Sequence, residues 1–170
     1  MAQEVGARLG QCEVLFRPVP QGEVGVTKLD FWQYTHDPLE KVVTLIAKRA
    51  LGQGERVLVV HADPGQRAAI SRALWEGGPE SFLANGEADA PGADRQLILL
   101  AGEPQAANGA SHVILADGSF RDTPGFARVF LLFPPDLAPA ARTAWRDQDG
   151  REGVERSYYA QEDGRWEKKG

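Results

Sequence analysis

Residues 55–64, ERVLVVHADP, give the clearest indication of the fold. The run RVLVV at 56–60 is apolar after its arginine, as in a strand that is buried on both faces of a parallel sheet. Asp63 then offers an N-cap and Pro64 suits the first turn of a helix, which we expect to continue to about Trp75. A strand that leads into a helix in this way predicts a βα unit.

The preceding segment has the same order of elements. Residues 28–34, KLDFWQY, are strand-like, and Asp37 and Pro38 are expected to begin a helix in the same way. The apolar residues of this helix recur every three or four positions, which predicts a single core-facing stripe of Leu39, Val42, Val43, Ile46, Ala47 and Ala50. Gly52 and Gly54 follow and are expected to end the helix.

Further elements continue this alternation. Strands are expected at 96–101 (QLILLA), 112–116 (HVILA) and 128–133 (RVFLLF), and a last helix is expected from Asp136 to about Gln148. A strand-like segment, VERSYYA, then a turn and RWEKK complete the chain. Because strands alternate with helices, the sequence predicts a single Rossmann-like α/β domain with a mostly parallel sheet flanked by helices.

The 170 residues are enough for one domain with its own core. We expect this domain to cover residues 27–170, and the Gly-, Pro- and Val-rich residues 1–26 to form an N-terminal extension outside it. The longest apolar runs are strand-sized, well short of the roughly 20 residues that a membrane helix needs. The opening MAQEVGARLGQ does not resemble a secretory signal, so we expect a cytoplasmic protein.

The net charge and the cysteine content restrict the kinds of ligand that the protein is expected to bind. The net charge of −5 at pH 7 disfavours direct binding to a nucleic-acid backbone, so a protein partner is the simpler expectation. The single cysteine, Cys12, excludes internal disulfides and cysteine-based zinc sites. The three histidines form neither an HExxH motif nor a cluster, and we therefore expect no metal.

The loops that follow the first two strands carry no nucleotide motif. Neither THDPLE nor HADPGQ contains a glycine-rich phosphate loop. At the start of the helices that follow, Asp37 and Asp63 would accept hydrogen bonds from amides that could otherwise bind phosphate. We therefore predict no nucleotide-binding site and no cofactor.

These loops nevertheless offer one catalytic alternative. His36 and His61 are expected in adjacent strand-to-helix connections, each with an aspartate one or two residues later. The alternative function is therefore a nucleotide-binding protein or a His/Asp acid–base enzyme that uses His36, His61 and Asp63. No GxSxG motif supplies a nucleophile.

The segment ALWEGGPESFLANG, residues 73–86, places Trp75 and Phe82 on either side of a Gly-Gly-Pro break. Helical phase rotates Trp75 away from the core stripe, onto a mostly polar face with Ser71 and Arg72. We therefore expect Trp75 to be partly exposed, with Phe82 returning beside it after the break. An exposed aromatic pair is typical of a protein-binding hot spot, whereas a buried structural pair is the alternative.

The last expected helix carries a second candidate surface. Its apolar stripe would comprise Leu137, Ala140, Ala141, Ala144 and Trp145. Arg142 and Arg146 lie one turn apart, and like charges at this spacing repel each other unless an anion lies between them. The two arginines beside Trp145 predict a clamp for a peptide carboxylate, whereas the alternative is a solvated basic face balanced by Asp147 and Asp149.

Residues from about 27 to 168 resemble the chi subunit of bacterial DNA polymerase III. Three pieces carry the likeness: GERVLVV after the first strand and helix, ALW and ESFL around the Gly-Gly-Pro break, and FPPDLAPAARTAWR followed by a Tyr-rich segment and GRWEKK. The resemblance implies a Rossmann-like fold without a nucleotide site. It also implies a non-catalytic accessory subunit of the clamp loader in DNA replication, with no cofactor.

The resemblance further implies two partner sites. Trp75 and Phe82 match residues that bind the psi subunit, and a helicase-like partner is the alternative on that surface. Arg142, Trp145 and Arg146 match residues that bind the acidic, Phe-ending tail of the single-stranded-DNA-binding protein. Contact with DNA would then be mainly indirect, and the protein would work in the bacterial cytoplasm.

The sequence also departs from the family pattern. Asn85 stands where histidine is usual, and Trp145 stands where tyrosine is common. Ala138, one turn before Arg142, is not the basic residue expected there. Residues 1–26 have no counterpart. We therefore expect a tail pocket that is weaker or rearranged.

Overall fold

The computed structural model describes residues 26–76 and 83–170. Its helices and strands are β1 (Thr27–Gln33), α2 (Leu39–Gly52), β2 (Val57–Val60), α3 (Pro64–Trp75), β3 (Asn85–Glu87), β4 (Ile98–Ala101), β5 (His112–Leu115), β6 (Arg128–Phe133), α4 (Ala138–Asp147), β7 (Val154–Glu162) and β8 (Arg165–Lys168). Two short 3₁₀ helices, η1 (Ala93–Arg95) and η2 (Pro135–Leu137), complete the described elements. The expected extension lies outside the described residues, apart from Val26.

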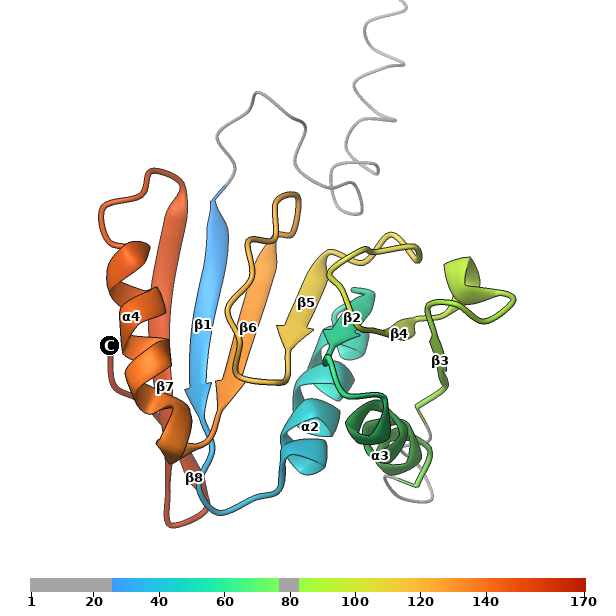
Figure 1. Ribbon diagram of the computed structural model, residues 1–170, viewed down its shortest axis with the longest axis horizontal. Coiled ribbons are helices and arrows are strands. Elements are labelled where there is room, and N and C mark those ends of the chain that lie inside the picture. Colours follow the sequence, from blue (N-terminus) through green and yellow to red (C-terminus); the bar gives the residue numbers. More distant parts are fainter. Residues whose placement is uncertain (1–25, 77–82) are drawn as a thin grey trace, which may run out of the picture.

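The described strands form one eight-stranded sheet in the order β3-β4-β2-β5-β6-β1-β7-β8 (Figure 1). Every neighbouring pair is parallel except β7 and β8, which pair antiparallel. The α/β class, the mostly parallel sheet and the flanking helices are therefore confirmed. In Figure 1, α4 lies beside β7, whereas α2 and α3 lie toward the other end of the sheet.

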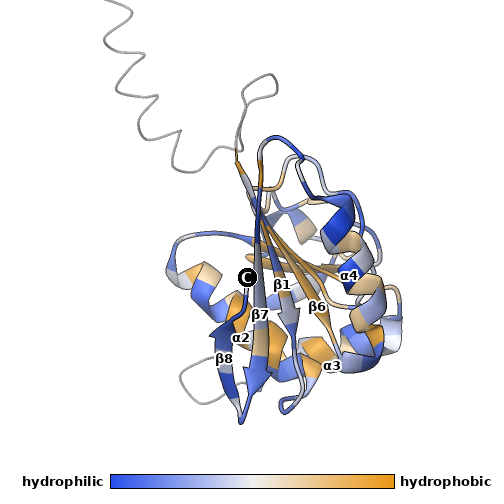
Figure 2. Ribbon diagram, turned by 90° about the vertical axis from the view of Figure 1, so that its left-hand side faces the viewer, coloured by the Kyte–Doolittle hydropathy of each residue, from blue (hydrophilic) through white to orange (hydrophobic). Residues whose placement is uncertain are grey.

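Two apolar layers hold the sheet between the helices. Val57 and Val59 pack in the layer that includes the buried side chains of α2 and α3, and Leu58 and Val60 pack in the layer that includes those of α4. All four residues of β2 are fully buried, as the RVLVV run predicts. In Figure 2 the central strands have the colour of hydrophobic residues, whereas β8 is coloured as hydrophilic.

Only one of the two predicted aspartate caps is present. Asp63 occupies the N-cap position of α3, and its carboxylate accepts a hydrogen bond from the Gly65 amide at 2.9 Å. The prediction that Asp37 caps the preceding helix is wrong, because the N-cap position of α2 is the extended Pro38, which leaves Asp37 one residue too early. Asp37 instead accepts a hydrogen bond from Lys41 at 3.0 Å.

The last helix begins later than expected. The 3₁₀ turn of η2 comes first, so α4 starts at Ala138 and not at Asp136. The buried residues of α4 are Ala138, Ala141 and Ala144. The expectation that Leu137 and Ala140 face the core is wrong, since both are exposed.

Candidate partner-binding site

Trp145 connects α4 to the sheet. Its ring meets Phe31 of β1 edge to face, with centroids 5.1 Å apart and planes at 72°. It meets Tyr158 of β7 in the same way, at 6.2 Å and 80°. Phe31 and Tyr158 are paired neighbours on adjacent parallel strands, so the two strands offer one aromatic platform to the helix. Trp145 is half-buried and its position is set by this platform.

Arg156 of β7 covers part of Trp145. Its guanidinium carbon lies 4.3 Å from the ring centroid, and its Nη1 donates a hydrogen bond to the Trp145 carbonyl at 2.6 Å. Its Nη2 forms an ion pair with Asp149 at 2.7 Å. Arg156 was not among the predicted site residues. Strand alternation offers a signal for it, because Arg156 and Tyr158 are two residues apart and share a face.

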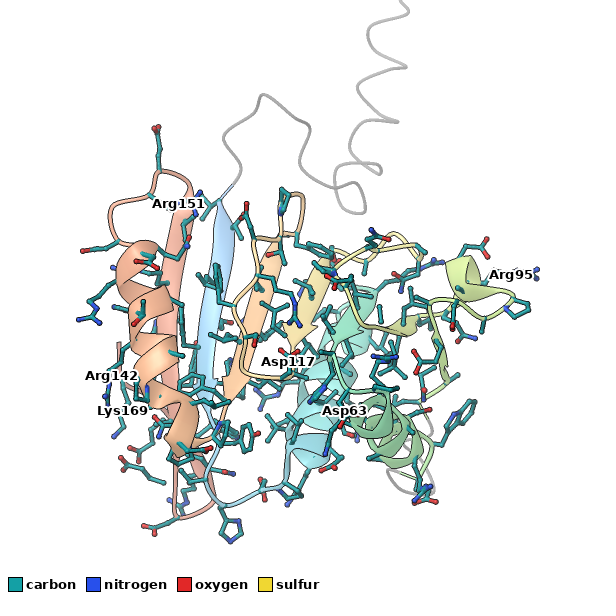
Figure 3. All side chains as sticks on the ribbon, in the orientation of Figure 1. Asp63, Arg95, Asp117, Arg142, Arg151 and Lys169 are labelled. Carbon is teal, nitrogen blue, oxygen red and sulfur yellow. The ribbon has the colours of Figure 1, made fainter. Side chains whose placement is uncertain are left out.

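Arg142 and Arg146 project from the same helix and are exposed. Neither forms a hydrogen bond or an ion pair within residues 26–76 and 83–170. Asp149, which the alternative interpretation assigned to balance them, is paired with Arg156. Figure 3 shows Arg142 on the outer side of α4. The described carboxylates therefore leave both positive charges available to a ligand.

Tyr158 links Arg142 to the aromatic platform. Its hydroxyl donates a hydrogen bond to Gln33 of β1. Burial raises the pKa of this hydroxyl, and the nearby positive charge of Arg142 acts in the opposite direction. Arg142 is therefore within electrostatic reach of the tyrosine. The structure brings Arg142, Trp145 and Tyr158 together on one surface, which we call the α4 surface, with Arg146 one turn further along the helix.

The second candidate surface is only partly within the described residues. Trp75 ends α3 with 38% of its surface exposed, which agrees with its predicted place on the polar face. Phe82 and the Gly-Gly-Pro break lie outside the described residues, so the pairing of the two rings stays a prediction. Beyond the break, the Leu83 amide donates to the Leu74 carbonyl at 3.0 Å, so the chain resumes against the end of α3.

Asn85 stands where the family pattern usually has histidine, and it forms hydrogen bonds within the fold. It is buried, and its Oδ1 accepts a hydrogen bond from the Ser71 hydroxyl at 2.6 Å. Its Nδ2 donates to the Leu83 carbonyl at 3.0 Å. The Ser71 bond joins α3 to β3, a short edge strand that was not among the expected elements. The NGE sequence of β3 has no apolar alternation that could have signalled a strand.

His36 and His61 do not meet. The expectation that their loops are adjacent is wrong, because β5 and β6 lie between β1 and β2 in the sheet. His61 Nδ1 accepts a hydrogen bond from the Asp63 amide at 3.0 Å, and Asp63 in turn caps α3. Burial lowers the pKa of His61, although Asp117 and Asp63 oppose this change. The polar contacts of His61 and Asp63 are those of a helix start.

The loop after β1 is organised from the far end of the chain. The buried Gln161 of β7 accepts three hydrogen bonds at its Oε1, from the amides of Thr35, His36 and Asp37 at 3.2, 2.9 and 3.1 Å. Its Nε2 donates to Asp37 at 2.8 Å. These amides are the donors that a phosphate at the end of β1 would need, and a neutral side chain already satisfies them.

In the described ranges, no group of three or more His, Cys, Asp or Glu side chains is placed to hold a metal ion. None of the described helices is both long enough and apolar enough to cross a membrane.

Taken together, the fold and these surfaces define an α/β protein in which two helices present aromatic and basic side chains to the outside. The model of the family "DNA polymerase III chi subunit, HolC" matches residues 26–154, and the chain belongs to this family. The match covers β1 through α4 and thus includes Trp75, Arg142, Trp145 and Arg146. No curated protein matches the chain.

Proposed function

We propose that this protein is a non-catalytic accessory subunit of DNA polymerase III that links the clamp loader to the C-terminal tail of the single-stranded-DNA-binding protein. Membership of the chi family supports a role in replication. The observation that carries the finer proposal is the α4 surface, where Arg142 and Arg146 lack carboxylate partners among the described residues beside a half-buried tryptophan. DNA is contacted mainly through the tail-bearing partner, in the bacterial cytoplasm.

The α4 surface suits a peptide that is acidic and ends in an apolar residue. Arg142 lies near Tyr158 and Trp145, so a terminal carboxylate bound to its guanidinium would bring the last side chain next to these rings. Arg146, one turn along α4, would then face the acidic residues that precede the terminus. Ala138, one turn before Arg142, is buried and carries no charge. The clamp therefore consists of the two arginines alone.

A peptide titration tests this assignment. The probe is a short acidic peptide ending in phenylalanine, made once with a free terminal carboxylate and once amidated. We expect Arg142→Ala or Arg146→Ala to reduce the binding free energy by about 1.5–3 kcal/mol, as for a charge-assisted contact. Arg95→Ala, at the other end of the molecule in Figure 3, is the matched control and should leave the affinity unchanged.

The amidated peptide identifies which arginine holds the terminus. If Arg142 binds the carboxylate, amidation weakens binding to the natural protein but has little further effect on Arg142→Ala. Added salt should weaken the free-acid peptide more than the amidated one. If both arginine variants bind the peptide as tightly as the natural protein does, α4 does not bind the tail.

The second partner is assigned to the surface around Trp75 and Phe82. A partly exposed tryptophan at a helix end supports a docking role there, with the psi subunit of the clamp loader or a helicase-like protein as the partner. Pull-downs from cell extract with the natural protein and with Trp75→Ala/Phe82→Ala, read by mass spectrometry, test this proposal. The double variant should lose this partner and still retain the tail-bearing one.

A further inference from the structure

The indole nitrogen of Trp32 lacks a hydrogen-bond partner. Trp32 lies on β1 and is only 4% exposed. Among the described residues, its Nε1 is the one buried side-chain nitrogen or oxygen without a partner. A buried donor left unpaired costs free energy, and such groups in folded proteins are nearly always satisfied by the chain, by water or by a ligand. An acceptor from outside the chain is therefore expected at this atom.

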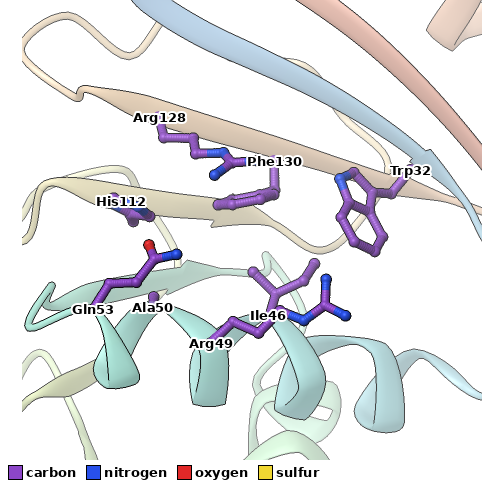
Figure 4. Close-up of a pocket in the computed structure, with 8 residues that line it drawn as sticks. All are labelled: Trp32, Ile46, Arg49, Ala50, Gln53, His112, Arg128 and Phe130. Carbon is purple, nitrogen blue, oxygen red and sulfur yellow. The ribbon is translucent and has the colours of Figure 1, made fainter. Parts of the chain in front are cut away.

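Trp32 lines a pocket that can hold such an acceptor. The pocket has a volume of about 120 Å³, room for several water molecules or a fragment of a few heavy atoms. Figure 4 shows it between α2, which contributes Ile46 and Arg49, and the strands that carry Arg128, Phe130 and Trp32. The indole nitrogen is on the edge of its ring that faces Phe130.

The chain offers Trp32 only a weak alternative. The Phe130 ring lies at 66° to the indole, with centroids 6.2 Å apart. An aromatic face is a poor substitute for an oxygen acceptor, so this contact explains the orientation of the ring better than it satisfies the N–H group.

The positive charges at the pocket are only partly compensated. Arg128 donates from Nε to the buried Asp30 at 2.8 Å, and its Nη2 lies 2.6 Å from the same carboxylate oxygen. Arg49 is exposed on α2 and has no hydrogen bond or ion pair within the described parts of the chain. Arginine and tryptophan side chains can only donate hydrogen bonds. The pocket thus presents unused donors and one unbalanced positive charge.

We propose that this pocket binds a carboxylate on a short aliphatic stem. One oxygen accepts from Trp32 Nε1, the charge is balanced by Arg49, and the methylene groups pack against Ile46, Ala50 and Phe130. The site is separate from the α4 surface, because Trp32 and the core of α2 belong to one apolar layer and Trp145 packs against the other. It extends the proposed function and does not depend on it.

The carboxylate could be a free small molecule or a glutamate side chain of a partner, and two probes distinguish these sources. Propionate represents the free acid, and N-acetyl-glutamate N-methylamide presents the same CH₂CH₂COO⁻ group on a blocked backbone. Binding is followed by the NMR signal of the Trp32 indole N–H proton, assigned through its contacts with Phe130. A bound carboxylate should move this signal downfield in a saturable manner.

Matched controls separate binding from charge screening. Propionamide has the same shape without the charge, and sodium chloride reproduces the ionic strength; neither should produce the saturable shift. Arg49→Gln should weaken propionate binding about tenfold or more, as expected when a charge-assisted contact is lost. Arg95→Gln removes the same charge from an exposed residue that does not line the pocket and should bind as the natural protein does.

Each outcome is decisive. Binding of propionate alone identifies a site for a free acid, and binding of both probes identifies a pocket open to a glutamate side chain. A Trp32 signal that does not move with either probe, or that moves equally with chloride, means that water alone satisfies the indole and overturns the proposal. Binding that Arg49→Gln leaves unchanged would also overturn it.

Discussion

The guanidinium of Arg156 lies over the ring of Trp145 at 4.3 Å and donates a hydrogen bond to the carbonyl of the same residue at 2.6 Å. One side chain of β7 thus contacts both the ring and the backbone of Trp145, near the C-terminal end of α4. The helix dipole favours a positive charge at this end. The C-terminal Gly170 also lies against Trp145. A ligand on the α4 surface can therefore use only the part of Trp145 that Gly170, Arg156, Phe31 and Tyr158 leave uncovered.

This contact predicts that Arg156 stabilises the docking of α4. Arg156→Met keeps an apolar stem over the ring but removes the hydrogen bond and the charge. We expect a loss of about 1–2 kcal/mol in the free energy of unfolding, measured by urea denaturation. Arg165→Met, an exposed arginine on β8, is the control and should stay within about 0.5 kcal/mol of the natural protein. Equal stability of the two variants would contradict an anchoring role for Arg156.

Trp75 should matter for binding and little for stability. Because 38% of the side chain is exposed, Trp75→Ala should cost less than the roughly 3–5 kcal/mol typical of a buried tryptophan. The same variant should lose the psi or helicase-like partner in a pull-down. Leu137→Ala changes a side chain that is nearly as exposed, at 36%, and should retain that partner. A large loss of stability in Trp75→Ala would favour the buried structural interpretation.

Gln161 should be a main determinant of the loop after β1. Gln161→Leu leaves the amides of Thr35, His36 and Asp37 without their shared acceptor, and we expect a destabilisation of about 1–3 kcal/mol in urea. Asp37→Ala removes a single contact with Gln161 and should cost less. The reverse order of the two losses would show that the Asp37 carboxylate, and not Gln161, organises this loop.

Asp117 should make the free energy of unfolding depend on pH in the acidic range. Burial alone would raise the pKa of its carboxyl, but hydrogen bonds from Arg121 and from the Ala62 and Ser119 amides outweigh burial and hold the pKa below its ordinary value. A carboxyl with a lowered pKa in the folded state contributes its full stabilisation above the unfolded pKa of about 3.9 and loses it as the pH falls through the folded value.

The stability advantage of the natural protein over Asp117→Asn should therefore be greatest near neutral pH and shrink below about pH 4. Urea denaturation of both proteins between pH 7 and pH 3 measures this difference. A difference that stays constant over the whole range would mean that the Arg121–Asp117 pair contributes nothing through its charge, despite its Nη2–Oδ2 distance of 2.6 Å.

Local sequence patterns predicted the order of the longer helices and strands, but not β3 or the two 3₁₀ turns. Apolar runs such as RVLVV, the stripe of α2 and the Asp63-Pro64 start of α3 are local signals, because the period of burial and the satisfaction of the first helical amides depend on residues a few positions apart. Helical periodicity also predicted that Trp75 is partly exposed. The sequence pattern placed Arg142, Trp145 and Arg146 on one helix.

Which distant residues meet depends on the assembled fold. The pairing of β1 with β6 and β7 separates His36 from His61. It joins residues 100 and 127 positions apart, which no local pattern encodes. For the same reason Arg156 on Trp145, Gln161 on the loop after β1 and the unpaired indole of Trp32 became visible only in the fold. Whether a polar side chain is buried, and which partner it bonds, depends on neighbours from distant parts of the chain. The polar groups of the α4 surface and of the Trp32 pocket are therefore defined only in the folded protein.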